Sequence, residues 1–126
     1  MLSKFNNSDH YLSREHHTQS FGANLTPALR VKAGQLIHVQ TWDCYKGQVL
    51  TEADLIKEIA DEFINPATGP IYIEGAEPGD TLSVTLLEIQ PEPRGAARLS
   101  VGEGQLHDKV SAPYGRFFSV VDGTVT

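Results

Sequence analysis

Cysteine and positive charge are what this sequence has least of. Cys44 is the single cysteine, so no disulfide can form within the chain, and this composition fits a reducing compartment. Lysine and arginine together number 10, against 16 aspartates and glutamates, which gives a formal net charge of −6. Nucleic acids and anionic membranes reward clustered basic side chains, so we expect neither of them as a partner.

Long apolar runs are also missing. The N-terminal stretch MLSKFNNSDHYLSREHH lacks the apolar core of a secretory signal, and no run approaches the length of about 20 residues that a membrane-spanning helix needs. We therefore expect a cytoplasmic protein. With 126 residues, 40% of them apolar, the chain is long enough for one domain with its own core.

What is present favours β-structure. Residues 36–42 are dominated by β-formers, and Ile37, Val39 and Thr41 alternate with His38, Gln40 and Trp42, the period of two that is typical of a strand. Ile71–Ile73 predicts a short strand between two clusters of turn residues, and TLSVTLLEI (81–89) predicts a longer strand whose end is apolar on both faces. The end of the chain, GRFFSVVDGTVT, predicts a hairpin with an Asp-Gly turn. Its last strand, ending at Val125-Thr126, is so short that we expect an unpaired edge, which favours self-association.

One segment has the pattern of a helix. In TEADLIKEIADEFI (51–64), Thr51 occupies the N-cap position and Asp54 follows it three residues later, as in a capping box. An Asn-Pro pair directly after the segment ends the helix. The apolar stripe consists of Leu55, Ile59 and Phe63. The expected fold is therefore mainly β, a sandwich or barrel-like set of sheets, with one short α-helix at about 51–64.

The motifs of serine hydrolases, zincins and nucleotide-binding loops (GxSxG, HExxH, the P-loop and GxGxxG) are all missing. Asp43 ends the strand of residues 36–42, a common place for a functional carboxylate, because the strand fixes the backbone while the loop leaves the side chain accessible. The residue pattern alone favours a second interpretation, in which Asp43 binds the amides of the turn that follows it.

Cys44 and the histidines can also be interpreted either as functional or as structural residues. Cys44 is a nucleophile if His38 or His107 lies near it, but a lone cysteine is more often a small buried hydrophobic residue, and we favour that interpretation. His16 and His17 are adjacent in the sequence, which does not suit a two-histidine metal site, so we expect both to be solvated.

Two blocks of sequence resemble one known family. NPATGPIYIEGAEPGDTLSVTLLEI is similar to a signature of the acetamidase/formamidase family, and TPALRVKAGQLIHVQTWDCYKGQV is similar to its other N-terminal block, with a Thr-aromatic-Asp-x-x-x-Gly-Gln run. The spacing of the blocks also matches, and together they cover residues 26–89. The resemblance implies a β-rich fold and the hydrolysis of short linear amides, such as formamide and acetamide, to a carboxylate and ammonia.

The resemblance also implies which residues form the site. Asp43 matches the Asp of the family's motif, as a catalytic general base toward water or as a ligand of a divalent metal, zinc or calcium. Gln48, Thr68, Gly69 and Pro70 match positions that shape the substrate pocket. A substrate with so few atoms offers little binding energy, so rigid Gly-Pro turns would preorganise that pocket.

The departure from the family concerns length. Family members are longer, and their second half carries a Gly-Gly-Asn-x-Asp segment and an acidic, His-containing, Gly-rich segment that this sequence lacks. We therefore expect a polar N-terminal segment (1–24) and a truncated N-terminal β-rich portion of the family's domain (25–126). Activity then requires a complementary C-terminal chain. A non-catalytic binding module and an inactive remnant that survives as a homo-oligomer are the alternatives.

Overall fold

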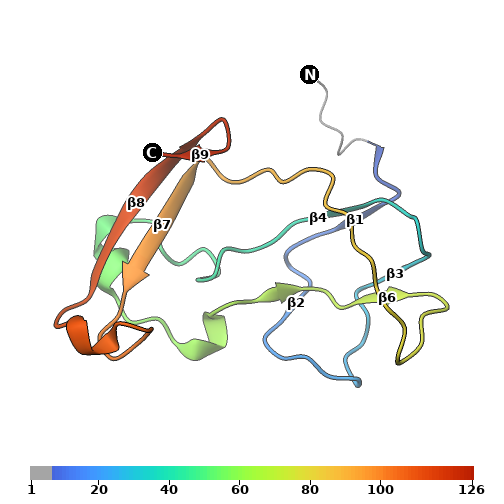
Figure 1. Cartoon of the computed structure of the whole chain (residues 1–126), viewed down its shortest axis with the longest axis horizontal. Coiled ribbons are helices and arrows are strands. Elements are labelled where there is room, and N and C mark those ends of the chain that lie inside the picture. Colours follow the sequence, from blue (N-terminus) through green and yellow to red (C-terminus); the bar gives the residue numbers. More distant parts are fainter. Residues whose placement is uncertain (1–6) are drawn as a thin grey trace. The chain divides into compact units, whose positions relative to one another are not determined.

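The computed structural model describes residues 7–126, which divide into two compact units (Figure 1). The first unit contains Met1–Lys46 and Ala60–Glu88, and the second contains Gly47–Ile59 and Ile89–Thr126. The predicted boundary after residue 24 stays a prediction. The segment of residues 1–24 contributes two short strands to the first unit.

The first unit is built from three pairs of short strands. β1 (His10–Leu12) pairs with β4 (Ile37–Val39) in parallel, and β3 (Leu29–Val31) pairs with β6 (Ile71–Ile73) in parallel. β2 (His17–Thr18) and β5 (Ala67–Thr68) form an antiparallel pair. Parallel neighbours need a long connection, and the antiparallel pair also joins segments that are far apart in the sequence.

The buried side chains of the first unit lie on its parallel strands. Leu12 of β1 and Val31 of β3 are its two buried hydrophobic residues among those that the structure describes. Turns with glycine follow β3 and β6. Gly34 adopts a φ of 85° after β3, and Gly79 adopts a φ of 103° in the EPGD turn, where the Asp80 N–H donates to the Glu77 carbonyl oxygen at 3.1 Å. A positive φ is the reason for glycine at both positions.

The second unit is an antiparallel sheet with the order β7 (Arg94–Leu99), β8 (Tyr114–Val121) and β9 (Thr124–Val125), drawn in orange and red in Figure 1. The predicted hairpin at the end of the chain is confirmed. Asp122 and Gly123 adopt φ values of 50° and 74° between β8 and β9, as a type I′ turn requires. A short 3₁₀ helix, η4 (His107–Lys109), lies in the connection from β7 to β8.

One face of this sheet is covered by the 3₁₀ helix η2 (Glu52–Ile56). Leu55 of η2 is only 2% exposed and packs against β8 at Gly115. A Cβ at Gly115 would lie 3.0 Å from both the Leu55 Cβ and the Ala97 carbonyl oxygen. Glycine at this position therefore lets the helix approach the sheet closely.

The mainly β fold is confirmed, but the continuous α-helix predicted for residues 51–64 is wrong. The capping box of Thr51 and Asp54 is present, yet it starts only η2, and a second 3₁₀ helix, η3 (Asp61–Phe63), belongs to the first unit. The physical reason is a tertiary contact. The Arg98 guanidinium of β7 donates to the carbonyl oxygens of Leu55 (2.8 Å) and Lys57, which a continuing α-helix would use for its own N–H groups.

The strand predicted for residues 81–89 is also not formed. These residues have no regular secondary structure and all are exposed. A strand needs a neighbour for its backbone groups, and the residues that the structure describes do not provide one. Over residues 7–126, no helix is long and apolar enough to cross a membrane.

Candidate active site

The predicted pocket residues Thr68, Gly69 and Pro70 lie together at the connection from β5 to β6 in the first unit. Gly69 is buried and has a φ of 143°, so only glycine fits there without strain. Hydrogen bonds from three segments hold this turn. They join the Thr68 hydroxyl to the Gln40 carbonyl oxygen (2.7 Å), the Gly69 N–H to the His16 carbonyl oxygen (2.9 Å), and the Ala28 N–H to the Pro70 carbonyl oxygen (2.9 Å). The turn is therefore fixed by three other segments of the same unit.

A groove of about 540 Å³ runs beside this turn. Its walls are residues 15–18, residues 25–28, and the Gly69-Pro70 pair. This groove is open and much larger than a molecule of the size of acetamide. A small ligand gains affinity only when most of its surface is enclosed, so this groove needs further walls to bind such a ligand tightly.

His17 of β2 lines the groove and is half-buried, whereas its neighbour His16 is exposed. The Nδ1 atom of His17 lies 3.0 Å from the Arg14 carbonyl oxygen and 3.2 Å from the Glu15 carbonyl oxygen. Carbonyl oxygens only accept hydrogen bonds, so Nδ1 carries the hydrogen and Nε2 carries the lone pair in the neutral ring. His17 is thus held in the tautomer that can accept a proton at Nε2, and it is not the solvated residue that the sequence suggested.

Arg14 connects His17 to Trp42, the residue directly before Asp43. The Arg14 guanidinium carbon lies 4.0 Å from the centre of the Trp42 ring, a cation–π contact. The Trp42 Nε1 atom is buried and has no hydrogen-bond partner within residues 7–126. Leaving a buried N–H group unpaired costs free energy. An acceptor for the Trp42 indole is therefore expected from outside the described residues.

Asp43 is exposed and lies four residues after the end of β4, because the observed strand stops at Val39 and does not reach Asp43 as the sequence predicted. Its Oδ1 atom accepts a hydrogen bond of 2.7 Å from the Tyr45 N–H, and its carbonyl oxygen accepts one of 3.0 Å from the Lys46 N–H. The turn geometry that the residue pattern favoured is therefore present. It fixes the carboxylate but still leaves Asp43 exposed.

The loop after Asp43 is tied to the segment before the Gly69-Pro70 turn. The Asn65 N–H donates to the Cys44 carbonyl oxygen at 2.8 Å. Cys44 is exposed, so the favoured interpretation of this residue as a small buried hydrophobic side chain is wrong. Gln48, the remaining predicted pocket residue, is exposed and belongs to the second unit.

The described residues do not fit a metal ion by themselves. Within residues 7–126, no three side chains of His, Cys, Asp or Glu come together in a group that could hold one. A hydrolytic zinc site takes about three protein ligands. Any metal ligation by Asp43 would therefore need ligands from outside this part of the chain.

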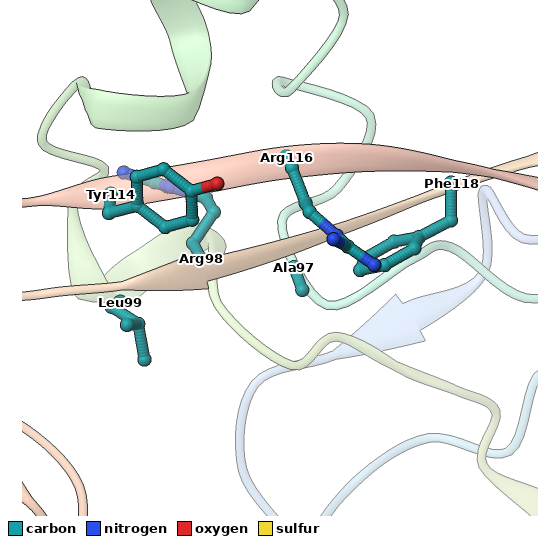
Figure 2. Close-up of a pocket in the computed structure, with 6 residues that line it drawn as sticks. All are labelled: Ala97, Arg98, Leu99, Tyr114, Arg116 and Phe118. Atoms are coloured by element: carbon teal, nitrogen blue, oxygen red, sulfur yellow. The ribbon is translucent and has the colours of Figure 1, made fainter. Parts of the chain in front are cut away.

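The second unit has a shallow pocket of about 260 Å³ on the face of β7 and β8 that η2 leaves open. In Figure 2, the Arg116 guanidinium lies over the Phe118 ring, and the distance from its central carbon to the ring centre is 4.2 Å. The remaining lining residues are Ala97, Arg98, Leu99 and Tyr114. No carboxylate or histidine lines this pocket, so it lacks an acid or base for hydrolysis at neutral pH.

The comparisons agree with the β-rich fold and with the two sequence blocks. A model of the acetamidase/formamidase family matches residues 6–119. The chain belongs to this family. In sequence, it is 34% identical to an acetamidase of Mycolicibacterium smegmatis over 74 residues, which are 56% of this chain and 18% of that protein.

Two solved structures of the family have the same fold. A recombinant predicted acetamidase/formamidase from Thermoanaerobacter tengcongensis matches with a TM-score of 0.85 and 34% identity, covering 92% of this chain and 38% of that one. An acetamidase from Bacillus halodurans matches with a TM-score of 0.86 and 28% identity, covering 92% of this chain and 39% of that one. The chain therefore spans less than two-fifths of these solved relatives.

The sequence indicated Asp43 and the Gly69-Pro70 turn through the resemblance, but it did not indicate His17 as a groove residue. The two-residue strand β2 is too short for a periodic signal, and its register opposite Thr68 depends on a segment 50 residues further along the chain. Only the adjacency of His17 to Thr18, a β-former, pointed weakly to a strand.

Proposed function

We propose that this chain forms part of an amidohydrolase that cleaves short linear amides, such as formamide and acetamide, to a carboxylate and ammonia. One observation carries this proposal: 92% of the chain shares the fold of a solved acetamidase/formamidase-type protein at 34% identity. Because the chain covers 38% of that protein, the proposed enzyme also needs a complementary polypeptide with the remaining part of the fold. Its location in the cytoplasm belongs to the same proposal, supported by the single cysteine.

In this proposal, the groove would contribute a base and one wall of the pocket to amide hydrolysis. A water molecule has to lose a proton as it attacks the amide carbon, and the leaving nitrogen has to gain one. His17 has its Nε2 lone pair available for the first step, because Nδ1 is committed to carbonyl oxygens. The fixed Gly69-Pro70 turn would hold one wall of the pocket, and Thr68 would hold that turn through its bond to Gln40.

Asp43 is the second candidate. We propose Asp43 as a general base or as this chain's ligand to a divalent ion. The resemblance and the exposed, fixed carboxylate support these two roles. Gln48 is proposed as a pocket residue on the resemblance alone. The complementary polypeptide would supply the other ligands, since no group of three exists within residues 7–126.

Ammonia release tests the proposal. The chain is mixed with a polypeptide that carries the part of the Thermoanaerobacter tengcongensis protein without a counterpart here, and formamide or acetamide is added. We expect ammonia from the mixture and none from either polypeptide alone. Asp43→Asn should abolish this release while the melting temperature of the chain stays the same. Full activity of the variant would show that Asp43 has only a structural role in its turn.

A second candidate is a non-catalytic, β-rich module that binds a partner or another copy of itself. The observation that favours it is the exposed apolar segment at residues 81–89. Sedimentation of the isolated chain and titration with acetamide separate the two: concentration-dependent dimers without any amide hydrolysis in the mixture would favour the module.

A further inference from the structure

Residues 81–88 of the first unit, called the docking segment below, have no hydrogen-bond partner for their backbone among residues 7–126. The chain is extended here without regular structure, between the EPGD turn and the start of the second unit. Within residues 7–126, each of these residues therefore leaves its backbone donor and acceptor without a protein partner.

The side chains of the docking segment are apolar but exposed. Leu82, Val84 and Leu86 follow each other at every second position and are 63%, 69% and 74% exposed, and Leu87 is 62% exposed. The same residues predict a strand whose end is covered on both faces. The conflict between a buried-strand pattern and full exposure shows that the covering surface is not part of the described chain.

A flexible connector between the two units does not account for this composition. Connectors that stay solvated are rich in Gly, Ser, Pro or charged residues. The docking segment, TLSVTLLE, contains four large aliphatic residues, two β-formers of the threonine type and only one charge. Pairing and burial of such a segment can offset the entropy that its ordering costs, whereas left in water it is a hazard for aggregation.

The solved relatives indicate what covers it. They share the fold of this chain at a TM-score of 0.85 or 0.86, and more than three-fifths of each relative has no counterpart here. A second copy of this chain is a poorer occupant, because two docking segments would form only a two-stranded ribbon, which is marginal in water and leaves its faces uncovered.

We propose that residues 81–88 become a strand in a sheet by docking onto a polypeptide that carries the missing part of the acetamidase/formamidase fold. The backbone of the segment would pair with strands of that polypeptide, while Leu82, Val84 and Leu86 would insert into its apolar face. The choice of occupant rests on the function proposed above. The docking itself rests on the exposed apolar strand pattern.

Amide hydrogen exchange tests the docking. The probe is a polypeptide carrying the part of the Thermoanaerobacter tengcongensis protein that has no counterpart in this chain. In the isolated chain, the amides of residues 81–88 should exchange at the rate of an open chain. In the mixture, their exchange should slow by about tenfold or more, because a strand within a sheet protects its N–H groups.

Two matched variants show whether the side chains take part. Val84→Lys places a charge on the docking segment, and Leu106→Lys places the same charge on a loop residue of the second unit that is equally exposed, at 67%. Both residues are exposed in the isolated chain, so neither variant should change its melting temperature. Val84→Lys should weaken the complex by about tenfold or more, while Leu106→Lys leaves the dissociation constant unchanged.

The outcomes separate docking from catalysis. A complex that releases ammonia while residues 81–88 still exchange rapidly would overturn the docking and leave the proposed function intact. A complex that protects the segment and releases no ammonia would support the docking and count against the function. If no complex forms, or if the isolated chain protects the segment as its own concentration rises, the proposed occupant is wrong.

Discussion

At the scale of single residues, the two units depend on a few close contacts. Gly115 is the clearest case, because a Cβ there would approach the Leu55 side chain to 3.0 Å and the Ala97 carbonyl oxygen to 3.0 Å. Leu55 is the buried side chain of the second unit, and neighbouring backbone cannot move without breaking the pairing of β7 and β8. The space at residue 115 therefore sets how closely η2 packs.

Replacing Gly115 by alanine should lower the free energy of unfolding by about 1–3 kcal/mol, the usual cost of overpacking. The control is Gly95→Ala in β7, where nothing lies within 4 Å of an added Cβ. Denaturant titration of both variants measures the difference. Equal midpoints for the two variants would show that Leu55 can shift without cost.

His17 offers a second prediction at this scale. In the mixture with the complementary polypeptide, His17→Gln should lower the rate of ammonia release by about 10²–10⁴-fold, the typical contribution of a general base. His107→Gln is the matched control, since His107 is an exposed histidine of the second unit that does not line the groove, and its variant should keep its activity within a few-fold. A similar loss in both variants would assign His17 a structural role.

At the scale of elements, the start of η2 depends on the carboxylate of Asp54. Its Oδ2 atom accepts hydrogen bonds from the Thr51 hydroxyl (2.8 Å), the Thr51 N–H (2.8 Å) and the Leu50 N–H (3.2 Å). The Thr51 side chain is the largest cause that lowers the pKa of Asp54 below its ordinary value of 3.8, followed by the backbone of Thr51 and Leu50. The ionised form is thus the one that holds the capping box.

This lowered pKa predicts how stability depends on pH. A carboxyl group whose pKa is lower in the folded state contributes its full stabilisation above the unfolded value of about 3.8 and loses it as the pH falls through the folded value. At pH 6, the melting temperature of the wild type should therefore be higher than that of Asp54→Asn. The difference between the two melting temperatures should disappear as the pH falls below 3.8. Melting curves from pH 6 to 3 measure it, and a constant gap would contradict the capping role.

The elements also show what the sequence can and cannot predict. Local signals were reliable: the Asp-Gly hairpin, the EPGD turn and the Thr51 cap are all present because a few neighbouring residues determine them. The helix of residues 51–64 failed because Arg98, more than 40 residues away, takes the carbonyl groups of Leu55 and Lys57.

The candidate site follows the same rule. Motif residues marked the Gly69-Pro70 turn and the exposed position of Asp43, but the groove itself arises from long-range pairing. His17 faces Thr68 across β2 and β5, and Arg14 carries the connection to Trp42. No local pattern in the sequence encodes such contacts, since each depends on which distant segment becomes the neighbour.

At the scale of the whole molecule, the chain buries little. Among residues 7–126, only Leu12, Val31 and Leu55 are buried hydrophobic residues, while the apolar side chains of residues 81–89 remain in water. Folding stability comes largely from apolar burial, and a domain with so small a core is only marginally stable. We therefore expect the isolated chain to unfold at low denaturant concentrations.

A complementary polypeptide should raise that stability in a way that depends on its concentration. A partner that binds only the folded state adds RT ln(1 + [L]/Kd), about 2.7 kcal/mol when its concentration is 100 times the dissociation constant. The melting temperature of the chain should thus increase steadily as the polypeptide with the missing part of the fold is added. Unrelated protein at the same concentration should leave it unchanged, because crowding contributes only about 0.2–1 kcal/mol. A melting temperature that does not respond to the complementary polypeptide would mean that the exposed apolar surface is not a binding surface for the rest of the fold.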